Sequence, residues 1–267
     1  MNLLNYKIKL PAKIKEDLVK RNILKIITGL NNFNIDKISN ICIAANKGNA
    51  TYIDIASDSY LIKSIKQITN LPICASSIIP EELYQSVKAG ADLIELGNYE
   101  SFYEKGFILN TQQIIHLTHK IRYMMPNIPL SVTIPSYLEL EEQLKLVLLI
   151  RNYNVNFLQT EGKYNIKSTN LFDYVKLALP TLIATNKIAN LVDIPIICSS
   201  GISLFTSSLA IYLGATGVGV GSLLNNINNE SDLIRVIKNL KVSLSLLITN
   251  NTKMLYNMNK TKSYIIR

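Results

Sequence analysis

Short apolar runs alternate along this chain with longer segments in which apolar residues recur every three or four positions. Ile194, Ile196 and Ile197 form one such run, and Leu204–Leu213 follows it with helical spacing. Short β-branched runs are typical of buried strands, and the longer periodicity is typical of amphipathic helices. Eight strands are predicted, at Arg21–Thr28, Thr51–Ala56, Leu71–Ser76, Asp92–Gly97, Pro129–Ile134, Val155–Thr160, Ile194–Cys198 and Gly217–Gly221.

Each predicted strand is followed by a predicted helix, and a further helix precedes the first strand. Pro80, Glu81 and Glu82 mark one helix start, because proline and acidic residues favour the first helical turn. Pro180 lies inside the predicted helix Leu171–Leu191 and predicts a kink or a break there. The other helices are expected at about Ile35–Lys47, Ser59–Thr69, Thr111 to just before Pro126, Leu138–Asn152, Leu204–Leu213 and Ser231–Thr249.

This alternation predicts a single β/α domain. No linker rich in serine or glycine divides the 267 residues. Eight strand–helix units favour a (β/α)8 TIM barrel of parallel strands, which typically takes about 250 residues. We expect an N-terminal capping helix below the barrel, a single barrel domain over residues 1–250, and a polar C-terminal tail over 251–267.

Charged residues occupy strand positions that this fold turns toward the barrel interior. Side chains alternate along a strand, and the face packed against the helices must be apolar. The aliphatic neighbours in each strand therefore place Lys25, Asp54, Glu95 and Glu161 inside. The same argument places these uncharged polar residues inside: Cys74, Ser76, Ser131, Thr133 and Gln159.

Three carboxylates and one lysine in a single interior predict acid–base chemistry. Glu95 and Glu161 lie nearest the carboxyl ends of their strands, where the active sites of such barrels are built, so they are the candidates for proton transfer. Lys25 and Asp54 are candidate electrostatic partners, and Lys25 is a Schiff-base candidate if its pKa is lowered. The alternative is that Lys25 and Asp54 form a structural ion pair.

Two glycine-containing turns near the C-terminal end predict an anion site. In TIM barrels, the loops after the seventh and eighth strands commonly bind phosphate. Backbone without Cβ atoms can approach a ligand closely, and its N–H groups can hold an anion. The alternative is that the glycines only relieve crowding inside the barrel. The residues predicted to bind substrate phosphate are Ser200, Gly201, Gly219, Gly221 and Ser222.

Several weaker signals complete the candidate chemistry. Asn31 and Asn98 follow the first and fourth strands and are candidates to hydrogen-bond substrate oxygens. His116 and His119 lie three residues apart on a helix predicted to be on the outside, without a nearby carboxylate or cysteine, so no metal site is predicted. The three cysteines form no CxxC pair and are expected to be reduced thiols.

Composition restricts the classes of partner. The net charge is +9, but the lysines are spread along the chain, so we expect no nucleic-acid binding. Abundant asparagine, isoleucine and lysine indicate an AT-rich gene rather than a basic binding surface. No apolar run approaches the roughly 20 residues of a membrane span, and neither a secretory signal nor a transit peptide is predicted.

The chain contains five distinctive short motifs: GLNNF at 29–33, DIA at 54–56, ELGN at 95–98, QTEG at 159–162 and GVGVGS at 217–222. Together they are similar to those of the hypothetical chloroplast reading frame twenty-three family, found in algal plastid genomes and in cyanobacteria. The resemblance extends over about Leu18–Leu240 and implies a (β/α)8 barrel that is plastid-encoded and located in the chloroplast stroma. The family has no established reaction, so it implies no catalytic residues.

The leading hypothesis from the sequence is an enzyme that acts on a small phosphorylated metabolite, as an isomerase, epimerase or lyase. The two glycine turns also resemble those of thiazole synthase, N-acylmannosamine-6-phosphate epimerase and FMN-dependent oxidoreductases. No cofactor is predicted for the leading hypothesis. The alternatives are an oxidoreductase that binds FMN at the same turns and a regulatory barrel that binds a metabolite without turning it over. A homo-oligomer is compatible with all three.

Overall fold

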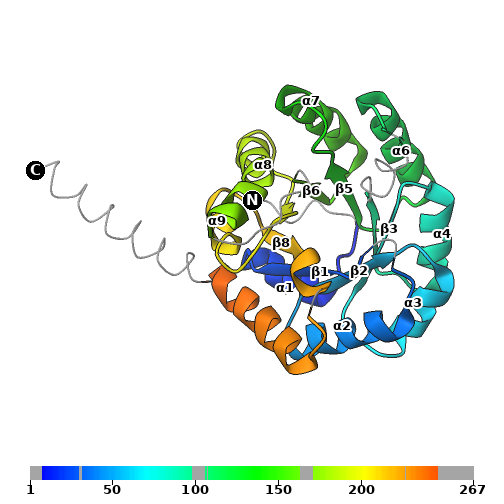
Figure 1. Cartoon of the computed structure of the whole chain (residues 1–267). Coiled ribbons are helices and arrows are strands. Elements are labelled where there is room, and N and C mark those ends of the chain that lie inside the picture. Colours follow the sequence, from blue (N-terminus) through cyan, green and yellow to red (C-terminus); the bar gives the residue numbers. More distant parts are fainter. Residues whose placement is uncertain are drawn as a thin grey trace, which may run out of the picture.

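Eight parallel strands close into a barrel in the order in which they occur along the chain. The computed structural model describes residues 8–29, 32–97, 106, 108–162, 171–225 and 227–245. Figure 1 shows the strands at the centre and the helices around them. The strands are β1 (Ile23–Ile27), β2 (Tyr52–Ala56), β3 (Ile73–Ser77), β4 (Leu93–Leu96), β5 (Leu130–Ile134), β6 (Phe157–Thr160), β7 (Ile196–Ser199) and β8 (Gly217–Val220).

The helices form the outer layer and bury their apolar faces against the sheet. Their starts follow local sequence signals: the side chains of Asn34, Asp58 and Asn110 each accept a hydrogen bond from the first turn of the helix that follows. The described helices are α1 (Ala12–Val19), α2 (Ile35–Lys47), α3 (Ser59–Lys66), α4 (Pro80–Ala89), α6 (Thr111–Met124), α7 (Leu140–Ile150), α8 (Leu171–Ala189), α9 (Ser207–Tyr212), α10 (Ser222–Asn225) and a last helix over 230–245.

The predicted TIM barrel is confirmed, and one local expectation is corrected. Helix α8 continues through Pro180 as a single helix, so the predicted break does not occur. Strong packing of its buried face, including Ala178 and Leu182, stabilises the helix across the proline. No helix in the described part of the chain is long and apolar enough to cross a membrane.

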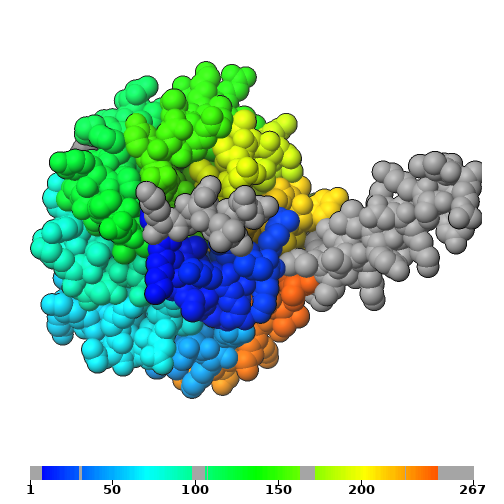
Figure 2. Space-filling view, turned by 180° about the vertical axis from the view of Figure 1, so that it is seen from behind, coloured from blue at the N-terminus to red at the C-terminus, as the bar shows by residue number. Residues whose placement is uncertain are grey.

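Helix α1 closes the bottom of the barrel, as the sequence predicts. Its residues Ile14 and Leu18 pack in one apolar cluster with interior residues such as Ile23, Tyr52 and Phe157. Figure 2, which views the molecule from behind, shows this N-terminal segment across the middle of that face. The interior therefore has an apolar floor, and polar side chains are confined to the layers above it.

A buried polar cluster fastens α1 to the last helix. The Lys241 Nζ atom donates to Asp17 Oδ2 at 2.8 Å and to the backbone oxygen of Asn22 at 2.5 Å. Thr51 Oγ1, at the start of β2, donates to the same Asp17 oxygen at 2.6 Å. Lys13 lies 3.5 Å from that oxygen. We call this group the basal clasp, because it joins the two ends of the described chain beneath the barrel.

Candidate functional site

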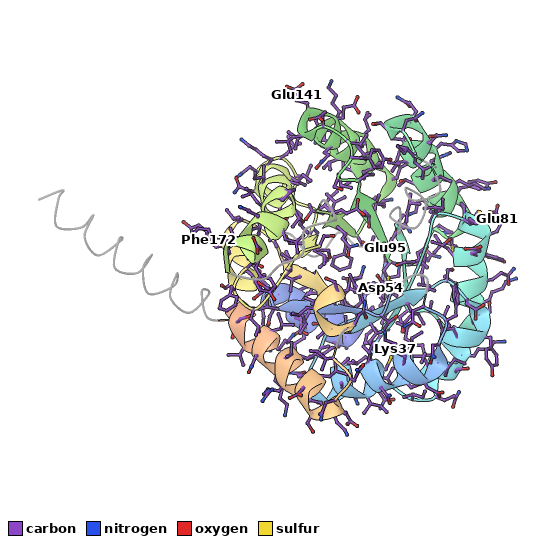
Figure 3. The ribbon with its side chains drawn as sticks, viewed as in Figure 1. Lys37, Asp54, Glu81, Glu95, Glu141 and Phe172 are labelled. Carbon is purple, nitrogen blue, oxygen red and sulfur yellow. The ribbon has the colours of Figure 1, made fainter. Side chains whose placement is uncertain are left out.

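Lys25 occupies the centre of the barrel and is fully buried. Its Nζ atom lies 2.7 Å from Asp54 Oδ2 and 2.8 Å from Glu95 Oε2. The predicted inward orientation of all three residues is confirmed, and Figure 3 shows Asp54 and Glu95 inside the barrel. Strands β1, β2 and β4 thus bring one ammonium and two carboxylates into direct contact, a group that we call the central triad.

Gln159 is a residue that the sequence argument placed inside but did not include in the site. Its Oε1 atom accepts from Lys25 Nζ at 2.8 Å, and its Nε2 atom donates to Glu95 Oε1 at 2.9 Å. Ser199 Oγ also donates to Gln159 Oε1, at 3.1 Å. The amide therefore connects the central triad on one side with the end of β7 on the other. Its position two residues before Glu161 was the available signal.

Hydroxyl groups complete the hydrogen bonding of the two carboxylates. Ser76 Oγ donates to Asp54 Oδ1 at 2.5 Å, and Thr133 Oγ1 donates to Glu95 Oε1 at 3.2 Å. Each carboxylate thus has one oxygen on Lys25 and the other on a neighbouring strand. Such complete pairing is what allows charges to remain in a dry interior.

The pKa values of Lys25 and Asp54 are both raised, for different reasons. Burial alone would lower the pKa of Lys25, but the carboxylates of Asp54 and Glu95 outweigh it and raise that pKa well above its ordinary value. Burial raises the pKa of Asp54 to about 6, with the Lys25 ammonium opposing the rise and Glu95 adding to it. Lys25 is consequently an ammonium ion at neutral pH, whereas Asp54 titrates near neutrality.

The protonated state of Lys25 decides between its two candidate roles, as a Schiff-base nucleophile or as an electrostatic partner. A Schiff base forms by attack of a neutral amine, which requires a lowered pKa. Lys25 has the opposite shift, and two carboxylates and an amide oxygen hold its Nζ atom. The arrangement favours an electrostatic role for Lys25 over a nucleophilic one. The ion pair with Asp54, which the structural alternative described, is present but extends to Glu95.

Glu161 lies at the mouth of the barrel, immediately after β6. Its Oε2 atom accepts from the backbone nitrogen of Ser136 at 3.0 Å, which ties it to the turn after β5. Most of its surface is buried. The carboxylate of Glu161 also contributes to raising the pKa of Tyr137, whose main cause is burial. Glu161 is therefore positioned by the loop layer, whereas Glu95 belongs to the central triad.

The turn after β7 has an unusual backbone. Ser200 and Gly201 have φ angles of 68° and 70°, so two consecutive residues are left-handed. A Cβ atom on Gly201 would lie 2.7 Å from the backbone of Leu177 in α8. Glycine is required there both by conformation and by space. Ser222 begins α10 after the adjacent strand β8 and is exposed.

The glycines of β8 are required for a different reason, which is the lack of space for a side chain. A Cβ atom on Gly217 would lie 2.4 Å from Ile23 Cβ, and one on Gly219 would lie 2.0 Å from Ser199 Oγ. Neighbouring side chains thus fill both spaces, which agrees with the crowding alternative for these two positions. At Gly221 the space is tight as well, because a Cβ atom would lie 3.1 Å from the Ile27 oxygen.

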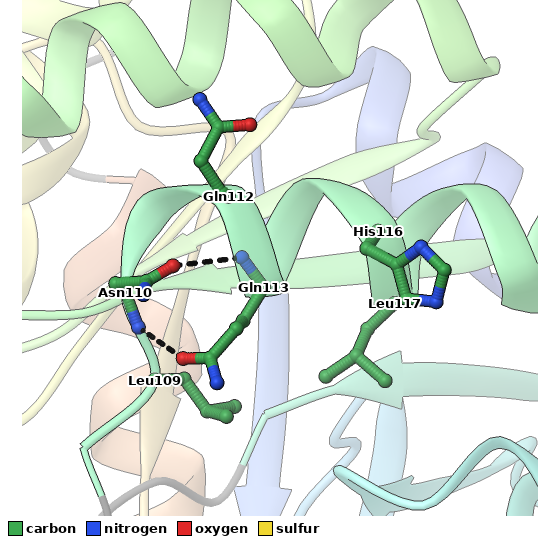
Figure 4. A pocket seen from close by; sticks show the side chains of 6 residues that line it. All are labelled: Leu109, Asn110, Gln112, Gln113, His116 and Leu117. Carbon is green, nitrogen blue, oxygen red and sulfur yellow. Dashed lines mark hydrogen bonds between the residues drawn. The ribbon is translucent and has the colours of Figure 1, made fainter.

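A pocket on α6 lies apart from the central triad, and two predicted contacts fall outside the described part of the chain. Asn31 and Asn98 lie outside the described residues. A pocket on α6 includes His116, but its amides Asn110 and Gln113 are occupied with each other in a helix cap (Figure 4). The pocket is lined by Leu109, Asn110, Gln112, Gln113, His116 and Leu117.

Fold and interior define a parallel (β/α)8 barrel with a buried lysine–dicarboxylate centre and a left-handed turn at its mouth. The chain belongs to the family described as "Protein of unknown function (DUF561)", whose model matches residues 10–250. It is 41% identical over 236 residues to the uncharacterized protein ycf23 of Cyanophora paradoxa, covering 87% of this chain and 97% of that one. The ycf23 protein of Cyanidium caldarium is 37% identical over 236 residues, covering 88% and 95%. These relatives confirm the family resemblance and indicate plastid encoding.

Solved structures share the fold at low sequence identity. Thiamine phosphate pyrophosphorylase from Pyrococcus furiosus superimposes with a TM-score of 0.58 at 16% identity, covering 85% of this chain and 97% of that one. The 2-keto-3-deoxy-6-phosphogluconate aldolase of Zymomonas mobilis, solved with 3-phosphoglycerate, gives 0.56 at 14% identity, covering 86% and 96%. At such identities the likeness concerns the fold alone.

Proposed function

We propose that this protein binds a small phosphorylated metabolite at the mouth of the barrel and catalyses proton transfer on it, as an isomerase, an epimerase or a lyase. The observation that carries the proposal is the central triad of Lys25, Asp54 and Glu95, which is fully buried in the centre of a TIM barrel. Buried charge is costly, and titratable groups with shifted pKa values concentrate at functional sites.

The left-handed turn at Ser200 and Gly201 supports a phosphate site. Consecutive backbone N–H groups in such turns can converge on an anion. The turn follows β7, beside the exposed Ser222 after β8, which is the usual place for phosphate in this fold. Two proteins of the same fold carry phosphate compounds in their names or crystals. Gly219 and Gly221 shape the end of β8 and are proposed to support the site through their backbone.

The proposed chemistry assigns different work to the two glutamates. Glu161, at the mouth, would remove or return a proton next to a carbonyl of the substrate. Glu95 would be the second acid–base group, held in place by the Lys25 ammonium at 2.8 Å. The Lys25 ammonium, balanced by Asp54, would stabilise negative charge that develops on the substrate oxygen. This scheme needs no Schiff base, which agrees with the raised pKa of Lys25.

Ligand binding is tested by thermal unfolding with inorganic phosphate, sugar phosphates and FMN. A ligand at about a hundredfold excess over its Kd stabilises by about 2.7 kcal/mol, or about 5–10 °C in a domain of this size. We expect Ser222→Glu to abolish the shift, because it places an anion at the mouth. Ser231→Glu is the matched control, since Ser231 is an equally exposed serine near a helix start. Equal shifts in both variants would contradict the phosphate site.

Catalysis is tested on the compound that stabilises best. We expect deuterium from the solvent to enter that compound with wild-type protein and not with Glu161→Gln, while the thermal shift persists in the variant. A stabilising compound without exchange or turnover would favour the regulatory alternative, and a yellow protein stabilised by FMN would favour the oxidoreductase. Plastid encoding supports the stroma as the site of action, which fractionation of intact plastids with an antibody would test.

A further inference from the structure

The outer faces of α8 and α9 carry a concentration of exposed apolar side chains. Within the described ranges, seventeen large apolar side chains are exposed, and eight of them lie between residues 172 and 212. Figure 3 shows Phe172 directed away from the barrel. The group that we call the α8–α9 patch consists of Phe172, Val175, Leu179, Ile183, Phe205, Leu209 and Tyr212.

On α8 the patch forms a continuous stripe. Val175, Leu179 and Ile183 are four residues apart and therefore lie above one another on a single helix face. Ala178 and Leu182, on the adjoining face of α8, pack in the core, whereas the three stripe residues remain 38–47% exposed. The apolar surface of α8 therefore extends beyond the part that the barrel covers, and exposed apolar surface of this kind marks an interaction site. The stripe is thus unexplained by the fold of one chain.

The two helices form a firm platform. Asn186 Nδ2 donates to the backbone oxygen of Leu213 at 3.3 Å, which joins the end of α8 to the end of α9. A Cβ atom on Gly214 would lie only 2.4 Å from Ala189 Cβ, so the backbones approach closely there. The backbone of such a platform needs no rearrangement before association, which lowers the entropic cost of binding.

We propose that the α8–α9 patch is a two-fold interface with a second copy of this chain. From the exposed fractions, which reach 78% at Phe172, the seven side chains present about 700 Å², close to the roughly 800 Å² per partner of a stable interface. A two-fold contact requires a surface that matches itself. The stripe on α8 matches itself about a two-fold axis near Leu179. An antiparallel second copy then places Val175 opposite Ile183 of the other copy and the two Leu179 side chains opposite each other.

Cross-linking tests the axis directly. A disulfide needs Cα atoms about 4.4–6.8 Å apart, so only residues at the axis can form one between copies. The native cysteines Cys42, Cys74 and Cys198 are all buried. We expect Leu179→Cys to give a covalent dimer on oxidation. Leu149→Cys, on α7, is the control, since Leu149 and Leu179 are both 47% exposed. Equal cross-linking of both variants would overturn the proposal.

Sedimentation of the full chain tests the dimer without cross-linking. We expect wild type at twice 29.9 kDa at micromolar concentration, Leu179→Glu at 29.9 kDa, and Leu149→Glu unchanged from wild type, with circular dichroism confirming that both variants fold. A monomeric wild type, or a dimer that survives Leu179→Glu, overturns the proposal. A dimer that forms only after residues 246–267 are removed also overturns it, because the tail would then be the occupant of the patch.

Discussion

Among the described residues, two lysines are buried in polar clusters, and burial and charge shift their pKa values in opposite directions. In the central triad, Lys25 faces two carboxylates, which raise its pKa well above the ordinary value against the effect of burial. In the basal clasp, Lys241 faces one carboxylate, Asp17, and burial prevails and lowers its pKa. Lys25 has two carboxylates in direct contact to oppose burial, whereas Lys241 has one, and nearby Lys13 also lowers its pKa.

The comparison separates a structural use of buried charge from a chemical one. The clasp has one carboxylate, Asp17, between Lys241 and Lys13, and it connects two helices by contacts to backbone and hydroxyl oxygens. The triad has one carboxylate more than it has ammonium groups, and the pKa of Asp54 is about 6. A carboxyl group with a pKa of about 6 can exchange its proton close to neutral pH, which is useful for proton transfer.

The largest effect is expected from Lys25→Met. The variant leaves Asp54 and Glu95 buried without their cation, so the free energy of unfolding should fall by about 3–5 kcal/mol in urea titrations near neutral pH. Adding Asp54→Asn and Glu95→Gln to Lys25→Met removes the uncompensated charge and should recover most of the loss. If the triple variant is no more stable than the single one, the cost arises from packing and not from charge.

A somewhat smaller effect is expected for the pH dependence that Asp54 produces. Its pKa is higher in the folded state, about 6, than the ordinary 3.8 of the unfolded chain. Its contribution to the free energy of unfolding is therefore fully present below pH 3.8 and is lost as the pH rises through the folded-state pKa of about 6. The difference in unfolding free energy between wild type and Asp54→Asn should change by about 3 kcal/mol across that window. Parallel stability curves for the two proteins would contradict the raised pKa.

The smallest effect is expected from Lys241→Met. Asp17 keeps the Thr51 hydroxyl at 2.6 Å and Lys13 at 3.5 Å, so its charge remains partly compensated. We expect a loss of about 1–2 kcal/mol in urea and no change in ligand-induced thermal shifts. Lys238→Met, which removes an exposed lysine from the same helix, should be nearly neutral. A loss as large as that of Lys25→Met would show that the two clusters do not differ as described.

The barrel and its inward-facing residues were predictable, because both depend on the spacing of apolar residues along the sequence. Alternation along β1, β2 and β4 sufficed to place Lys25, Asp54 and Glu95 inside. The Lys25–Asp54 ion pair was one of the alternatives, but the contacts of Lys25 with Glu95 and Gln159 were not predictable, because they depend on the relative heights of the strands. Lys25 is level with Tyr52 and not with Asp54, and its long side chain spans the difference.

The glycines of β8 show a second limit of prediction from the sequence. Pattern alone cannot distinguish a glycine that admits a ligand from one that admits a neighbour. At Gly219 the neighbour is Ser199, a residue twenty positions earlier, and only the packed structure brings its hydroxyl into the vacant space. The left-handed Ser200 was equally out of reach, because a serine carries no signal for a positive φ angle.

The basal clasp also determines how late during synthesis the fold can be completed. Its lysine and aspartate are 224 positions apart. At about 5–20 residues per second, Lys241 leaves the ribosome about 10 s or more after Asp17. Until β8 is made, β1 has a partner only on its β2 side, so one edge of the nascent sheet stays open to pairing with other chains. The contacts of the clasp can therefore form only after the whole barrel has been synthesised.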